Sequence, residues 1–445
     1  MNSEKLIDLC VDALDRTKRK GADEVEVYAE SVRTITVAIE KNDLQVSRAQ
    51  KETMIGVRAM CKKRVGFAST NDPTTIDETC ADAVTLAKAS PADENNVLPQ
   101  PEKSEYVSGI YDPACEGFTI DGAIEQAMKM LDIARSIDKR LILGNGEFSV
   151  HIGTRALINS KGVSWSEPES LFVYYALATA REGEKVSNMD YQFDATRNAD
   201  SIDVEPITRR ACENALGSLG AKKGESFNGQ VVLSPNAAQS LFASLILFQA
   251  NAKNVLRGMS RWKDALGSAV ASDLITIVDD GRMPDGVGTA SFDREGVAHK
   301  RLNLIESGKL ASFMHNTYTA TALRMENTGH AAGSARSVPG IGPSNFEILP
   351  GERSKDELVA EIDKGVLVTR FSGRADPVSG DFSGVAKGGY LIENGRISRP
   401  ISGTLIAGNT FEALKSLSGV SREQERVFSL TLPYLRLEGI SVTAG

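Results

Sequence analysis

One apolar segment in the second half of the chain constrains the fold more than any other feature. Ser234 and Pro235 suit the cap and first residue of a helix, and Gly258 suits its end, so we predict one helix from 235 to about 257. Within it, residues 241–248 read LFASLILF and carry no ionisable side chain. A helix that is apolar nearly all round is buried in its domain or in an interface. Because it has no ionisable side chain, this segment can supply neither a general base nor a metal ligand.

The chain divides into three units around this helix. Residues 1–90 and 115–220 each mix helical and strand patterns, and a proline-rich stretch over 90–117 separates them. Residues 227–445 contain strand fragments separated by glycine turns. We therefore expect a multi-domain α+β fold, with two mixed helix–sheet modules at the N-terminus. A large β-rich C-terminal domain with one buried helix should follow them.

Periodicity locates the elements of the first unit. Apolar residues at helical spacing predict a helix over 2–20. Alternation with period two over 24–30 and again over 34–40 predicts two strands in a meander of about five. Thr75 followed by Glu78 has the spacing of a capping box and predicts the start of a second helix.

Turn and cap motifs locate elements of the third unit. Ser307-Gly308 and Asn394-Gly395 each lie between apolar arms, so each predicts a tight β-hairpin. The two hairpins hint at an internal repeat, although unrelated hairpins share this turn chemistry. Ser354, with Glu three residues later, predicts a capped helix between them.

Composition excludes several classes of protein. Of the 445 residues, 51 are Lys or Arg and 59 are Asp or Glu, which gives a net charge of -8 and no basic footprint for nucleic acid. The acidic N-terminal residues and the eight-residue length of the longest apolar run predict neither a signal peptide nor a membrane span. Five widely spaced cysteines predict reduced thiols, and we expect a cytoplasmic protein.

The histidines offer no local catalytic motif. No two of the four are closer than fifteen positions, so HExxH is absent, and phosphate-loop and nucleophile-elbow motifs are absent as well. His330 and Arg336 lie in a glycine-rich loop, and His315 lies near Tyr318, so these four side chains are candidates to face a substrate or partner. The simpler interpretation is a solvated His330 and a partly buried, structural His315.

Several short motifs occur in a fixed order over nearly the whole chain. They lie at 24–30, 64–70, 278–281, 304–308, 343–345, 377–383, 391–395 and 406–409. Together and in this order they resemble the TldD/PmbA family, cytosolic metallopeptidases once described as modulators of DNA gyrase. The stretch 377–382 (PVSGDF) resembles the PmbA branch, also called TldE.

The resemblance identifies four positions where a metal site would lie. The TldD-like branch carries HExxxH on the helix of the third unit and a cysteine near the C-terminus. Alignment without gaps over 231–281 places the first histidine on Ala243, the glutamate on Ser244 and the last histidine on Phe248. The cysteine falls on Ser421. Alanine and phenylalanine have no ligand atom, and neutral serine is a poor zinc ligand and cannot replace a carboxylate base.

The resemblance therefore implies a subunit with no catalytic residue and no metal of its own. Its partner would be a TldD-like paralogue that bears HExxxH and holds zinc, in a heterodimer or a larger assembly. The complex would degrade or trim peptides and unfolded small proteins, without nucleic acid or membrane. Two alternatives remain: a stand-alone homodimeric binding or regulatory protein, and a peptidase with ligands from distant residues such as His315 and His330. A role at DNA gyrase is a weaker idea, because the chain is acidic.

Overall fold

The first two predicted units share one continuous sheet. The computed structural model describes residues 2–445, apart from the side chain of Val46. The sheet has seven strands in the order β3-β2-β1-β4-β5-β6, and β7 pairs with β5. The strands are β1 (Glu24–Glu40), β2 (Asp43–Cys61), β3 (Arg64–Thr70), β4 (Leu141–Asn159), β5 (Ser164–Glu182), β6 (Lys185–Val186) and β7 (Asp190–Thr196).

The first unit contributes three strands to this sheet, two of them long, where the sequence predicted about five. The two predicted strands over 24–30 and 34–40 are one strand, β1, because residues 31–33 also pair with β2 on one side and β4 on the other. The predicted first helix is confirmed as α1 (Ser3–Arg19), and α2 (Ile76–Ala89) starts where expected. The predicted capping box is wrong, because the Thr75 hydroxyl donates to the Asp72 carbonyl at 2.9 Å instead.

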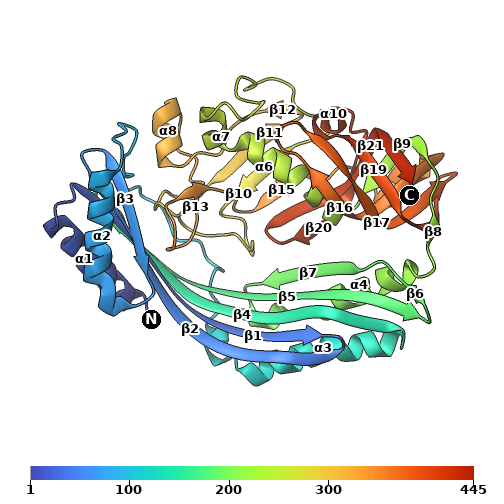
Figure 1. Cartoon of the computed structure of the whole chain (residues 1–445), viewed down its shortest axis with the longest axis horizontal. Helices are drawn as coiled ribbons and strands as arrows, with labels where there is room; N and C mark the ends of the chain where they lie inside the picture. Colours follow the sequence, from blue (N-terminus) through green and yellow to red (C-terminus); the bar gives the residue numbers. More distant parts are fainter. Residues whose placement is uncertain (1) are drawn as a thin grey trace.

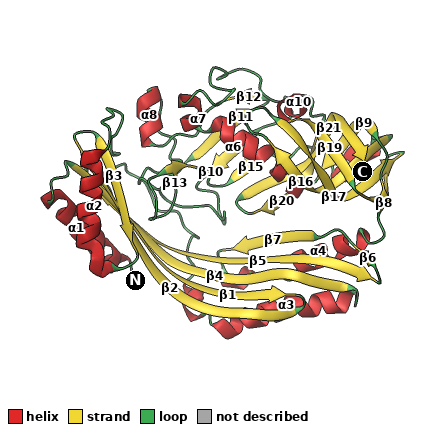
Figure 2. Cartoon of the chain, in the orientation of Figure 1, coloured by secondary structure: helices red, strands yellow, loops and turns green. Residues whose placement is uncertain are grey.

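Helices cover one face of the sheet, and the third unit covers the other. In β1, odd-numbered residues such as Val27 and Val37 pack under α1 and α2 at one end and under α3 (Ile120–Ile137) and α4 (Glu205–Gly217) at the other. Even-numbered residues such as Glu26 and Tyr28 meet the third unit, since successive strand side chains point to opposite faces. Figures 1 and 2 show the third unit above the sheet and α1, α2 and α3 on its outer side.

The third unit is β-rich and contains a closed ring of strands. Its twelve-stranded sheet follows the order β12-β11-β10-β15-β21-β9-β16-β17-β18-β8, and β19 joins β17 to β21. The pairings β21–β9–β16–β17–β19–β21 therefore close on themselves. The strands are β8 (Lys222–Lys223), β9 (Phe227–Leu233), β10 (Ile277–Asp280), β11 (Arg301–Glu306), β12 (Lys309–Leu310), β15 (Phe346–Ile348), β16 (Lys364–Ala375), β17 (Asp381–Glu393), β18 (Arg396–Ser402), β19 (Thr404–Asn409), β20 (Gly419–Val427) and β21 (Leu430–Ala444).

Short elements complete the molecule. A two-stranded ribbon stands apart from the large sheets, and several helices and 3-10 turns lie at strand ends. Among residues 2–445, no helix is both long and apolar enough to cross a bilayer. The short elements are η1 (Pro73–Thr75), η2 (Pro113–Gly117), η3 (Ala199–Ser201), α8 (Thr317–Leu323), β13 (Ala331–Ala332), β14 (Gly340–Ile341), α9 (Lys355–Ala360) and α10 (Thr410–Lys415).

Both predicted hairpins and the predicted third-unit cap are confirmed. Ser307-Gly308 joins β11 to β12, and Asn394-Gly395 joins β17 to β18. All four turn residues have positive φ, between 43° and 78°, as a type I′ turn requires. The Ser354 side chain accepts from the Glu357 backbone N–H and Glu357 reciprocates, which completes the capping box of α9.

The predicted helix over 235–257 is interrupted. It consists of α5 (Pro235–Ala238), the π-helical turn η4 (Gln239–Ala243), α6 (Ser244–Ala250) and α7 (Ala252–Leu256). Asn251 is extended (φ -74°, ψ 112°), and its side chain caps α7 by accepting from the Lys253 N–H at 2.9 Å. Asparagine competes with helical hydrogen bonding in this way, which explains the break. The prediction of burial is confirmed, because five of the eight residues of 241–248 are buried in the main core of the third unit.

Candidate functional site

Three of the four positions where the resemblance implies a metal site lie where η4 meets α6. Ala243 ends η4 and is 2% exposed within the apolar core. Ser244 is exposed and Phe248 is half-buried, both on α6. The π turn that precedes α6 is a feature often found at functional sites. These three side chains bring one hydroxyl and no imidazole or carboxylate to this part of the helix.

The fourth position, Ser421, makes structural hydrogen bonds. It is fully buried on β20, where its hydroxyl donates to the Glu423 carbonyl at 2.7 Å and accepts from the Tyr434 N–H at 2.9 Å. The register between β20 and β21 shifts between Val420 and Gln424, so these bonds satisfy backbone groups at an irregularity.

The side chains at these four positions do not fit a zinc ion. Structural and catalytic zinc sites need at least three imidazole, thiolate or carboxylate ligands. Two positions have no ligand atom, and the Ser421 hydroxyl is occupied. In the described part of the chain, no group of three or more His, Cys, Asp or Glu side chains is placed to hold a metal. The five cysteines are all buried and unpaired.

The structure brings His315 and His330 together. The backbone N–H of His330 donates to the backbone carbonyl of His315 at 3.2 Å, and both residues are 1% exposed. His330 Nε2 lies 3.1 Å from Asp279 Oδ2, and its Nδ1 lies 2.8 Å from the Thr328 carbonyl oxygen. The expectation of a solvated His330 is therefore wrong: the glycine-rich loop folds inward, and both ring nitrogens are occupied.

His315 has a different environment. Within residues 2–445, neither of its ring nitrogens has a hydrogen-bond partner, and burial lowers its pKa to about 4. His299 is half-buried near His330, and desolvation together with the proximity of His330 lowers its pKa to about 3. His315 is therefore more buried than the sequence suggested, and it is neutral at physiological pH.

Tyr318 connects the third unit to the linker, and Arg336 connects it to the first unit. The Tyr318 hydroxyl on α8 donates to Asp93 Oδ2 at 2.8 Å. The exposed Arg336 guanidinium pairs with Glu52 on β2. Both residues therefore contact segments that lie far earlier in the chain, which sequence spacing alone did not indicate.

A buried network of charges joins the first and third units, and the sequence analysis missed it. Arg58 on β2 donates to Glu26 at 2.5 Å and to Glu295 at 2.8 Å, and Arg294 donates to Glu26 at 3.1 Å. All four residues are at most 8% exposed. Adjacent Asp293 accepts three backbone N–H bonds, and burial, with the charge of Glu295, raises its pKa to about 8. The run Asp-Arg-Glu-Gly at 293–296 is the only sequence signal for this network.

A cavity of about 330 Å³ opens beside this network, between the first and third units. Residues of β2, β3, the linker, α7, the start of α8 and the loop at 338–339 form its walls. Tyr318 is the one predicted substrate- or partner-facing residue that lines it. The lining residues are Arg58, Met60, Val65, Asn96, Val97, Lys253, Leu256, Arg257, Glu295, Asn316, Tyr318, Thr319, Val338 and Pro339.

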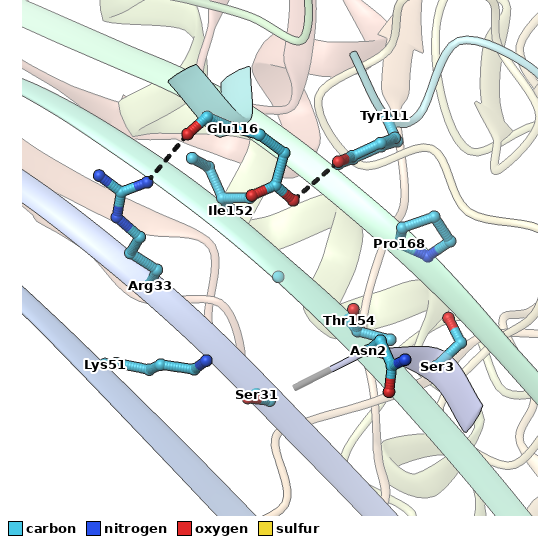
Figure 3. A pocket seen from close by; sticks show the side chains of 11 residues that line it. Asn2, Ser3, Ser31, Arg33, Lys51, Tyr111, Glu116, Ile152, Thr154 and Pro168 are labelled. Atoms are coloured by element: carbon cyan, nitrogen blue, oxygen red, sulfur yellow. Dashed lines mark hydrogen bonds between the residues drawn. The ribbon is translucent and has the colours of Figure 1, made fainter. Parts of the chain in front are cut away.

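A second cavity, of about 390 Å³, lies on the helix-covered face of the sheet (Figure 3). Arg33 and Lys51 lie directly opposite each other on β1 and β2 and both line it. Arg33 donates to the Glu116 and Phe118 carbonyls, and the Tyr111 hydroxyl donates to the Glu116 carboxylate at 2.8 Å. None of the candidate residues predicted from the sequence lines this cavity.

Comparison with known proteins identifies the family. Three family models match consecutive parts of the chain, described as PmbA/TldA metallopeptidase domain 1 (25–87), central domain (114–219) and C-terminal domain (226–444). The chain belongs to the PmbA/TldD metallopeptidase family. A metalloprotease of Methanothermobacter thermautotrophicus is 26% identical over 94% of this chain and 92% of its own length. Metalloprotease PmbA of Escherichia coli O157:H7 is 25% identical over 94% of this chain and 93% of its own length.

Among solved structures of the PmbA/TldD family, TldE from Thermococcus kodakarensis is similar to this chain throughout. It superposes with a TM-score of 0.90 at 26% identity, covering 98% of this chain and all of that one. The α+β architecture with a large β-rich C-terminal part is therefore the architecture of this family.

Proposed function

We propose that this chain is the non-catalytic, PmbA/TldE-like subunit of a cytoplasmic zinc metallopeptidase complex. Its relatives bear the name metalloprotease, and the crystallised TldE superposes over nearly its full length. The observation that carries the proposal is the absence of metal-ligand side chains at four positions on η4, α6 and β20. Where the family resemblance requires two histidines, a glutamate and a cysteine, this chain has Ala243, Phe248, Ser244 and Ser421.

The proposed partner is a TldD-like paralogue that bears HExxxH and holds the zinc. In this arrangement the present chain forms one wall of the chamber in which the partner cleaves peptides. An unfolded peptide lies there as an added strand, held mainly by main-chain hydrogen bonds and with little sequence preference. The substrates are peptides and unfolded small proteins.

Reconstitution tests this proposal. The HExxxH-bearing relative from the same cells is purified alone and together with this chain, and cleavage of an unfolded casein fragment is followed. We expect fast cleavage only by the pair and none by this chain alone, with zinc bound by the relative. Equal cleavage by the relative without this chain would contradict the proposal. EDTA-sensitive activity of the purified chain alone would favour a peptidase with its own distant ligands.

A further inference from the structure

The cavity between the first and third units is lined by two cationic side chains that have no ion-pair partner among the described residues. Lys253 and Arg257 lie four residues apart at α7 and both line the cavity. Among residues 2–445, neither side chain has an ion pair or a hydrogen-bond partner. Arg58 also lines the cavity, and its buried Nε donor has no partner in the same range. An open cavity with two free cations fits an anionic ligand.

The carboxylates near the cavity are already occupied. Glu295 accepts from Arg58 with one oxygen and from the Thr317 N–H, at 2.9 Å, with the other. Asp93 accepts from the Tyr318 hydroxyl and from Asn95. Of the charged residues that line the cavity, Arg58, Lys253 and Arg257 are cations and Glu295 is an acid, so the net charge of the cavity wall is positive.

The rest of the wall suits an apolar group and one amide. Leu256 and Val338 are 39% and 47% exposed although both line a cavity, and Met60 and Val97 line it too. Asn96 donates through Nδ2 to the Lys63 carbonyl at 2.8 Å. Its Oδ1 has no donor within the part of the chain that the structure describes, so it can accept a peptide N–H. An apolar side chain, a carboxylate and an N–H occur together at the C-terminal residue of a peptide.

We propose that this cavity binds the C-terminal residue of a peptide. The α-carboxylate lies at Lys253 and Arg257, the apolar side chain rests on Leu256 and Val338, and an amide N–H donates to Asn96. A volume of about 330 Å³ accommodates one or two residues of a peptide. The source of the peptide rests on the proposed function, because a peptidase complex provides peptide ends, but binding itself needs neither metal nor partner.

Fluorescence anisotropy with the purified full-length chain tests the inference. The probe is a pentapeptide Ala-Ala-Ala-Ala-Leu with fluorescein at its N-terminus, prepared with a free carboxylate and, separately, with a C-terminal amide. We expect the acid to bind about tenfold more tightly than the amide, the loss typical of removing a charged hydrogen-bond partner. The Lys253→Gln/Arg257→Gln variant should weaken binding of the acid by about tenfold and abolish the preference over the amide.

A matched control variant removes the same number of positive charges at residues that do not line the cavity. Arg301 and Lys309, on β11 and β12, are exposed and have no ion pair among the described residues, so Arg301→Gln/Lys309→Gln removes the same charge elsewhere. This variant should bind both probes as the unmodified chain does. Circular dichroism confirms that each variant is folded before it is titrated.

Three results would overturn the inference. These are equal binding of acid and amide by the unmodified chain, unchanged binding by the Lys253→Gln/Arg257→Gln variant, and an equal loss in the control variant. Competition by acetate as strong as that by the peptide would be a fourth such result, because acetate has neither the apolar side chain nor the N–H and a bare carboxylate would then be the ligand. None of these results bears on whether the chain assembles with an HExxxH-bearing partner, so the two proposals fail separately.

Discussion

Removing the Arg58 side chain should destabilise the junction between the first and third units. Within residues 2–445, Arg58 is the one cation that bonds both Glu26 and Glu295, at 2.5 Å and 2.8 Å, and each of these acids is 1% exposed. In Arg58→Met, Glu26 keeps Arg294, but Glu295 keeps only the Thr317 N–H. Leaving a buried charge without its partner costs about 3–5 kcal/mol of unfolding free energy.

Urea unfolding followed by circular dichroism measures this loss, with Glu295→Gln and the double variant completing a cycle. The double variant should lose about 1–3 kcal/mol less than the sum of the single losses, because the neutral amide that replaces the carboxylate no longer needs the cation. Arg374→Met is the control, since the Arg374 side chain is 86% exposed and should tolerate the change. An Arg58→Met loss below about 1 kcal/mol, or strict additivity in the cycle, would refute the reasoning.

Three further predictions follow from buried groups and turns. In the folded chain the pKa of His315 is about 4, so as pH falls below 6.5 the unfolded chain binds the proton first, and the free energy of unfolding decreases between pH 6.5 and 4. In urea unfolding, the free energy of unfolding of His315→Gln should fall by about 2 kcal/mol less between pH 7 and 5 than that of the unmodified chain. A loss equal to that of the unmodified chain would refute the shifted pKa. Gly395→Ala should lower stability by about 1–2 kcal/mol, because φ is +74° and the new Cβ would lie 2.5 Å from the Ala360 carbonyl oxygen; an unchanged melting temperature would contradict this. Restoring the family's two histidines, glutamate and cysteine at the four positions on η4, α6 and β20 should give at most weak zinc binding by calorimetry, because the surrounding side chains that orient ligands are missing; tight stoichiometric binding would contradict it.

Local chemistry explains which elements the sequence predicted correctly. Asn394-Gly395 and Ser307-Gly308 impose positive φ at their own turns, and Ser354 caps its own helix, so a short window contains the whole cause. The burial of most of residues 241–248 was likewise evident from their apolar character.

Features that depend on distant partners were missed. The continuous β1 exists because β2 and β4 both pair through residues 31–33, which the weak local pattern does not reveal. Glu295 lies 237 positions from Arg58, and Arg294 lies 268 positions from Glu26, so no spacing rule joins them. The inward fold of the loop at His330 depends in the same way on Asp279, 51 positions earlier.

Purification of this chain from its own cells under native conditions tests the central claim most directly. Mass spectrometry identifies what co-purifies, and zinc is counted per complex. The account predicts a near-equimolar HExxxH-bearing relative that carries all the zinc. A homo-oligomer with its own stoichiometric zinc would contradict the account, and a metal-free homo-oligomer would contradict it in favour of a stand-alone binding protein.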